Sequence, residues 1–197
     1  MEHILNIQTE EIQKDGKDTY YNHRYEPTPY ELLDQFFDEY PLKKEDYFVD
    51  YGCGPGRLLF YIHHRFHCEV TGVEYNEDYY KKCLDNIVSY KGTHKEKIHV
   101  FHCGAQDYVV DDRQTIFYFF NPFSIEIFMH TLSQIQDSLF RAPRKIKLIM
   151  YYPDSEYIYY LENYTEFTLS QSISVGTASK KDSRESFLIW DGGAAAL

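Results

Sequence analysis

The stretch of the chain best suited to chemistry is VDYGCGPGR at residues 49–57, which holds three glycines at alternate positions. Glycine has no Cβ atom, so the backbone amides of such a loop can approach a ligand closely. An apolar run precedes the loop and a helical pattern follows it, which places the amino end of a helix beside the glycines. The loop therefore predicts a binding site for a small-molecule cofactor.

The spacing of the glycines excludes two common nucleotide-binding loops. The dinucleotide fingerprint G-x-G-x-x-G requires glycine or alanine at position 57, where this chain has Arg57. The phosphate loop G-x-x-x-x-G-K-[ST] fails as well, because no Lys-Ser or Lys-Thr pair follows the glycines. The sequence thus disfavours NAD and excludes ATP bound through a P-loop.

The loop resembles D-x-G-x-G-x-G, the cofactor motif of class I S-adenosylmethionine-dependent methyltransferases. The resemblance implies that the cofactor is bound by Asp50, Gly52, Cys53, Gly54 and Gly56. In that family the second strand ends in an acidic residue that binds both ribose hydroxyls. Glu74 holds that place at the end of TGVE, and a carboxylate suits two vicinal hydroxyl donors.

The segment GAQDY at 104–108 resembles the family's adenine-binding segment after the third strand, which makes Asp107 the candidate for the adenine amino group. Taken from the residues alone, the pattern favours Asp107 as an acid that caps a turn or lies in a loop.

Asn121, Pro122 and Phe123 follow the fourth predicted strand and are similar to the [DN]-P-P-[YF] motif of amino-directed methyltransferases, with one proline missing. In that motif the Asn side chain accepts hydrogen bonds from the target nitrogen, and acceptors stabilise the positive charge that grows there. The resemblance implies methyl transfer to nitrogen. A strand-ending turn with a buried Phe123 is the structural alternative. A small-molecule O-methyltransferase and a non-catalytic module that docks a protein partner are the functional alternatives.

Short apolar runs alternate with helical patterns, which indicates an α/β fold. The predicted strands are 47–51, 69–74, 98–102, 115–120, 145–151, 167–175 and 186–190, and the last two form a closing hairpin. The predicted helices are 57–65, 77–90, 124–139 and 155–163. The resemblance implies a three-layer Rossmann-like sandwich around a seven-stranded, mostly parallel sheet whose last strand is antiparallel.

Residues 1–28 are predicted to form an N-terminal arm before a methyltransferase domain at 29–197. Thr28-Pro29-Tyr30-Glu31 reads as a capping box, with the Thr28 hydroxyl at the N-cap of a helix that begins at Pro29. In the family this region often folds over the cofactor as a lid. We therefore expect Tyr25 and Thr28 to contact the methionine end of the cofactor or the acceptor.

Composition limits the partners. The formal net charge of -11 disfavours a long nucleic-acid footprint, although it suits a cationic cofactor and an amine acceptor. The acceptor is therefore expected to be a small molecule or a protein, and the sequence does not indicate an oligomeric state. The four cysteines form no CxxC pair, and the first 18 residues lack the features of a signal peptide, so a cytoplasmic location without membrane spans is expected.

Two clusters of residues are expected to have no part in the chemistry. His63 and His67 have the spacing of metal ligands on a helix, but no glutamate partner accompanies them, so no metal is expected. Basic residues at 141, 144, 145 and 147 precede the fifth strand and are expected to form a solvated edge on the side opposite the cofactor.

Overall fold

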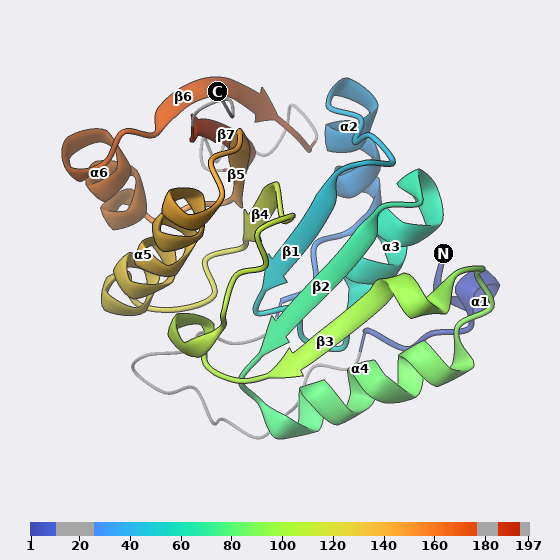
Figure 1. Ribbon diagram of the computed structural model, residues 1–197. Coiled ribbons are helices and arrows are strands. Elements are labelled where there is room, and N and C mark those ends of the chain that lie inside the picture. Colours follow the sequence, from blue (N-terminus) through green and yellow to red (C-terminus); the bar gives the residue numbers. More distant parts are fainter. Residues whose placement is uncertain (11–25, 177–184, 194–197) are drawn as a thin grey trace.

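The computed structural model describes residues 1–10, 26–176 and 185–193 (Figure 1). Its centre is a seven-stranded sheet with the strand order β3-β2-β1-β4-β5-β7-β6. The strands are β1 (Tyr47–Tyr51), β2 (Glu69–Glu74), β3 (Ile98–His102), β4 (Ile116–Phe119), β5 (Ile146–Tyr151), β6 (Thr168–Ser174) and β7 (Ser186–Gly192). The predicted strands are therefore confirmed to within two residues at each end.

The direction of the strands also agrees with the expected fold. Strands β1 to β5 pair in parallel, whereas β7 runs antiparallel to both of its neighbours, β5 and β6. The central strands β1 and β4 are buried along their whole length, as strands covered on both faces must be. The predicted α/β fold with an antiparallel last strand is confirmed, and β6 and β7 form the expected closing hairpin.

Helices cover the sheet on both faces (Figure 1). One hydrophobic core contains residues of α2 (Tyr30–Glu39), α3 (Arg57–Phe66) and α4 (Glu77–Ser89), and the other contains residues of α5 (Ile125–Arg141) and α6 (Ser155–Tyr164). Two short 3-10 turns, η1 (Lys95–Lys97) and η2 (Ala105–Asp107), flank β3. The short helix α1 (Glu2–Leu5) was not predicted, because four residues carry no readable periodicity.

Aromatic rings fill both cores, which explains the abundance of tyrosine and phenylalanine. On the α2 side, Phe36 stacks on Phe187 with ring centroids 4.0 Å apart. On the α5 side, Phe128 stacks on Tyr157 at the same separation. Both stacks join a helix to a segment distant in sequence, so the rings help to hold the layers in register.

The predicted cap of α2 is wrong. The helix begins at Tyr30, Pro29 takes the N-cap position, and no side chain caps the helix. The hydroxyl of Thr28 instead lies 3.2 Å from the hydroxyl of Tyr118 in β4. A tertiary partner has replaced the local hydrogen bond that the sequence suggested, because Thr28 is buried against the sheet.

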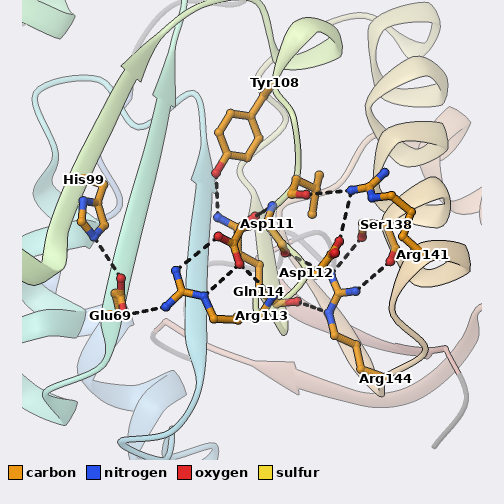
Figure 2. A network of polar contacts seen from close by, with 11 residues as sticks. Glu69, His99, Tyr108, Asp111, Asp112, Arg113, Gln114, Ser138, Arg141 and Arg144 are labelled. Carbon is orange, nitrogen blue, oxygen red and sulfur yellow. Dashed lines mark hydrogen bonds and ion pairs between the residues drawn. The ribbon is translucent and has the colours of Figure 1, made fainter. Parts of the chain in front are cut away.

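The basic residues before β5 do not all form the solvated edge that was predicted. Arg144 donates hydrogen bonds to the carbonyls of Asp111, Gln114 and Ser138 and to the hydroxyl of Ser138 (Figure 2). It also donates to the carbonyl of Ala142. These bonds tie the connection between β3 and β4 to the carboxyl end of α5. Lys145 is exposed, as expected, but Arg144 is a structural residue that unsatisfied backbone carbonyls have drawn inward.

His63 is buried and is held by main-chain groups on both sides of its ring. Its Nδ1 lies 2.9 Å from the carbonyl of Cys68, and its Nε2 lies 2.8 Å from the carbonyl of Thr93. Within residues 1–10, 26–176 and 185–193, no group of three or more His, Cys, Asp or Glu side chains is placed to hold a metal ion. No helix in the same residues has the length and apolar character needed to cross a membrane.

Candidate active site

The glycine loop that follows β1 has the conformation for which glycine is required. Gly52, Gly54 and Gly56 have φ angles of 80°, 54° and 93°, in the left-handed region that other residues rarely adopt. The amides of Gly52 and Cys53 donate to the carbonyl of Val73, at 2.8 and 3.3 Å. The loop therefore turns over the end of β2 before α3 begins at Arg57, as the sequence predicted.

Glu74, at the end of β2, lies directly against this loop. One carboxylate oxygen accepts a hydrogen bond from the amide of Gly54 at 2.8 Å, and the other accepts from the amide of Asn76 at 2.7 Å. Burial raises the pKa of Glu74, while the amides of Asn76, Gly54 and Tyr75 oppose that rise. The structure thus brings the predicted ribose ligand and the glycine loop together, and the ribose contact itself stays a prediction.

Asp50 lies beneath the loop in β1 and is only 5% exposed. It accepts no hydrogen bond from any residue that the structure describes. Burial, followed by the negative charge of Glu74, raises the pKa of Asp50 to about 8. A buried carboxyl group without a polar partner is costly, so this position favours a ligand that brings a positive charge.

Two hydroxyl groups lie in the same region of the sheet. Tyr118 of β4 is the register partner of Asp50 in β1, and the charge of Asp50 contributes to the raised pKa of Tyr118. The Tyr118 hydroxyl contacts that of Thr28, which is 6% exposed. Sequence reasoning missed Tyr118, although a tyrosine within an otherwise apolar central strand is a usable signal. Tyr25, the other predicted arm contact, lies outside the described residues.

The side chain of Cys53 turns away from the loop and into the core. A Cβ atom on Gly72 of β2 would lie 2.5 Å from its Sγ, so that glycine makes room for the thiol. A hydrogen bond with Cys83 and burial raise the pKa of Cys53 well above its usual value. Cys53 can therefore serve a ligand only through its backbone, and its protonated thiol is no nucleophile.

Asn121 and Pro122 form a strained turn beside the glycine loop. Asn121 has a φ angle of 41°, which is uncommon for a residue with a side chain, although Asn tolerates it better than most. A Cβ atom on Gly52 would lie 2.8 Å from Cβ of Pro122, so the turn after β4 and the loop after β1 are in direct contact. Strain of this kind concentrates at functional sites.

Phe123, the third residue of the predicted motif, is buried. Its ring is 4% exposed and meets the ring of Phe119 edge to face, while its carbonyl accepts a hydrogen bond from the Tyr157 hydroxyl. The ring is thus part of the core in this conformation. The structure leaves Asn121 as the polar group of the motif, and a stacking role for Phe123 stays a prediction.

Tyr152 is a second strained residue that sequence reasoning missed. Its φ angle of 48° is unusual for a residue with a bulky side chain. Tyr152 comes directly after β5, and Asn121 comes two residues after the end of β4. Strands β4 and β5 pair in parallel with Phe119 opposite Met150, so both residues with a positive φ angle lie at the carboxyl ends of the strands. No pattern in the sequence marks such a φ angle at a tyrosine.

Asp107 lies at the end of η2, in the connection between β3 and β4, and is exposed. It lines a cavity of about 500 Å³ that extends along the sheet from Cys103 to Glu69 at the opposite end of β2. Tyr108 also lines this cavity, and its hydroxyl accepts a hydrogen bond from Nε2 of Gln114 at 2.6 Å. Adenine recognition by Asp107 stays a prediction.

The residues at the carboxyl ends of the central strands fit S-adenosylmethionine, the cofactor that the sequence implied. Asp50 offers to a cationic ligand a buried carboxyl group that accepts no hydrogen bond from the described residues, and Glu74 offers an anionic acceptor beside the loop. The left-handed φ angles of the three glycines disfavour side chains at these positions, so the backbone of the loop stays bare. Asn121 precedes Pro122, which packs against Gly52, and its part in binding an acceptor stays a prediction.

Comparison with solved structures shows the same fold in several methyltransferases. An RNA methyltransferase from Salinibacter ruber in complex with S-adenosyl-L-homocysteine has a TM-score of 0.57 and 13% identity, over 87% of this chain and 95% of that chain. A SAM-dependent methyltransferase from Aquifex aeolicus has a TM-score of 0.60 and 15% identity, over 84% and 93%. StiE O-MT residues 961–1257 have a TM-score of 0.59 and 11% identity, over 85% and 74%.

Sequence comparison gives the family. No curated protein matches the chain significantly. The family model described as "Histone methylation protein DOT1" matches residues 7–115, which is more than half of the chain and includes the glycine loop, Glu74 and Asp107. The chain therefore belongs to the DOT1 histone methylation family and is an S-adenosylmethionine-dependent methyltransferase.

Proposed function

We propose that this enzyme methylates an amine nitrogen of a protein side chain, held at Asn121. The observation that carries the proposal is the contact between Gly52 and Pro122, because it places the turn containing Asn121 against the cofactor loop. A group held by Asn121 is then close to a cofactor bound above the glycines. Alignment of two reacting groups in this way can supply on the order of 7 to 11 kcal/mol of catalysis.

The side chains around the loop favour nitrogen over oxygen as the acceptor. When bound, S-adenosylmethionine supplies an activated methyl group on a sulfonium centre. The amide oxygen of Asn121 can accept a hydrogen bond from an N–H group and orient its lone pair. A hydroxyl acceptor would need a base, yet burial raises the pKa values of Tyr51 and Tyr118 well above their usual range. These tyrosines stay protonated and cannot remove a proton from an alcohol.

The charge of the chain and the name of its family support a basic protein as the acceptor. The matching family is described by histone methylation, and histones are rich in lysine and arginine. A net charge of -11 attracts such a partner and repels the phosphates of a nucleic acid. We therefore propose a lysine-type amine on a basic protein as the substrate, in preference to a small molecule. Its ammonium group releases a proton to water before transfer, and the neutral nitrogen then takes the methyl group as the bond from that group to the sulfonium sulfur breaks.

A direct test compares acceptor classes in one assay. The enzyme is incubated with S-adenosylmethionine labelled in the methyl group and, in separate reactions, with core histones, total RNA, or mixtures of small amines and phenols. We expect label in histone protein, stable to mild alkali and mapped by mass spectrometry to side-chain nitrogen. Label found only in RNA, or as an alkali-labile ester, would contradict N-directed transfer to protein.

A further inference from the structure

Arg57 is a buried arginine at the first position of α3, directly after the glycine loop. Its Nε donates to the Thr9 hydroxyl at 2.9 Å, and one terminal nitrogen lies 3.2 Å from a carboxylate oxygen of Glu2. The other terminal nitrogen donates to the carbonyl of Thr28 at 3.4 Å, and the guanidinium lies 4.7 Å from the centre of the Tyr30 ring. One side chain thus holds residues on both sides of the stretch 11–25.

Asn86, in the last turn of α4, makes a second connection between the N-terminal segment and the glycine loop. Its Oδ1 accepts from the amide of Gln8 at 2.8 Å, and its Nδ2 donates to the carbonyl of Gln8 at 3.0 Å. The same Nδ2 donates to the carbonyl of Pro55, inside the glycine loop, at 2.9 Å. Asn86 is 4% exposed, so these contacts are shielded from water and satisfy its amide fully.

The two side chains therefore attach the beginning of the chain to the glycine loop at adjacent points. Asn86 fixes Pro55, and Arg57 follows Gly56, so the contacts flank the turn that leads into α3. Arg57 also fixes Thr28, whose hydroxyl meets that of Tyr118 beside the buried Asp50. Asn86 bonds directly to the loop at Pro55, whereas Arg57 bonds to the N-terminal segment and Thr28 and reaches the loop through the chain at Gly56.

We propose that Arg57 and Asn86 are positioning residues for cofactor binding, which hold the glycine loop in its binding conformation by tying it to residues 8–9 and to Thr28. The loop needs such support because its left-handed turns are otherwise among many that glycine can adopt. The proposal rests on the enzyme's use of its cofactor and is independent of the acceptor. A wrong role for Arg57 and Asn86 would leave the proposal of N-directed transfer standing. A different acceptor would likewise leave the role of Arg57 and Asn86 unchanged.

The test measures the affinity of the purified 197-residue chain for S-adenosylhomocysteine by calorimetry. Arg57→Met keeps the length of the side chain and removes its donors, and Arg65→Met is its matched control. Arg65 lies in the same helix and binds Asp34 and Asp38, far from the loop. We expect R57M to raise the Kd about tenfold or more, R57K to recover part of the loss, and R65M to change the Kd by less than about twofold.

Asn86→Asp tests the second contact, with Ser89→Ala as its control. N86D loses the donor that faces Pro55, whereas S89A removes bonds to the backbone carbonyls of Asn6 and Asn86 and leaves the Asn86 side chain in place. We expect weaker binding in N86D and none of that loss in S89A. If R57M does not fold, Thr9→Val removes the acceptor of the Arg57 Nε in a milder way. Wild-type affinity in the folded variants, or equal losses in R57M and R65M, would overturn the proposal.

Discussion

The carboxylate of Glu74 accepts a hydrogen bond from the backbone amide of Gly54 at 2.8 Å, which links the acidic side chain at the end of β2 directly to the cofactor loop. The second carboxylate oxygen is held by Asn76. These two neutral amides hold the Glu74 carboxylate beside the loop without a cationic partner among the described residues. Two backbone amides hold the Glu74 carboxylate in place of a lysine or arginine side chain, so its remaining lone pairs can accept hydrogen bonds from the hydroxyls of a sugar.

Replacing Glu74 by Gln should weaken cofactor binding while preserving the fold. The amide is the same size as the carboxylate, but it brings a donor where two backbone donors already point, and it loses the charge-assisted bonds. We expect the Kd for S-adenosylhomocysteine to rise by about 10- to 100-fold. Glu69→Gln is the control, because Glu69 lies at the other end of β2 and pairs with His99. Equal effects of E74Q and E69Q would remove Glu74 from the binding site.

The sequence predicted the framework of this enzyme better than its polar contacts. Strand limits followed from apolar runs, and the loop followed from the spacing of Gly52, Gly54 and Gly56, since both are local properties. The hydroxyl of Thr28 was assigned to a local cap and found a partner ninety residues away in Tyr118. Such long-range partners depend on which elements become neighbours, and spacing along one segment does not contain that information.

Asp50 should make the stability of the protein depend on pH. Its pKa is about 8 in the folded protein, so between pH 4 and 8 the native state keeps a proton that the unfolded chain releases. Stability therefore falls as the pH rises through this window. Asp50→Asn removes the effect and should stabilise the apo protein at pH 9 by about 1 to 5 kcal/mol relative to wild type, with little difference near pH 4.

Urea unfolding of both proteins between pH 4 and 9 measures this difference. The same residue should also link cofactor affinity to pH, because a cationic ligand favours the ionised carboxyl group. Wild-type affinity for S-adenosylmethionine should rise as the pH approaches 8, and D50N should lose that dependence along with much of its affinity. Parallel stability curves for the two proteins would show that Asp50 titrates normally.

The contact between Gly52 and Pro122 should tolerate no added carbon. Gly52→Ala places a Cβ atom 2.8 Å from Cβ of Pro122 and at a φ angle of 80°, so both the contact and the backbone are strained. We expect a loss of about 1 to 3 kcal/mol of stability, measured by denaturant unfolding. Adding Pro122→Gly removes the clashing atom and should recover part of the loss. A double variant no better than the sum of its parts would place the two residues out of contact.

Arg144 should contribute to stability without affecting the cofactor. It donates five hydrogen bonds that join the β3–β4 connection to α5, at the amino ends of the strands (Figure 2). Arg144→Met leaves several partly buried acceptors without a donor and should lower stability by about 2 to 4 kcal/mol. The adjacent exposed Lys145→Met should cost less than about 0.5 kcal/mol. A change in cofactor affinity of folded R144M would show that the network reaches the site.

Asn121 separates backbone strain from chemistry, because two substitutions remove its side chain in different ways. Asn121→Gly deletes the amide but accepts a φ angle of 41° freely, whereas Asn121→Ala deletes the amide and keeps the strain. We expect N121G to be at least as stable as wild type and N121A to be less stable. Both should bind the cofactor normally and lose turnover on histone by about 100-fold, since each lacks the acceptor that orients the target nitrogen. If N121G keeps wild-type turnover, Asn121 shapes the turn and another group holds the acceptor.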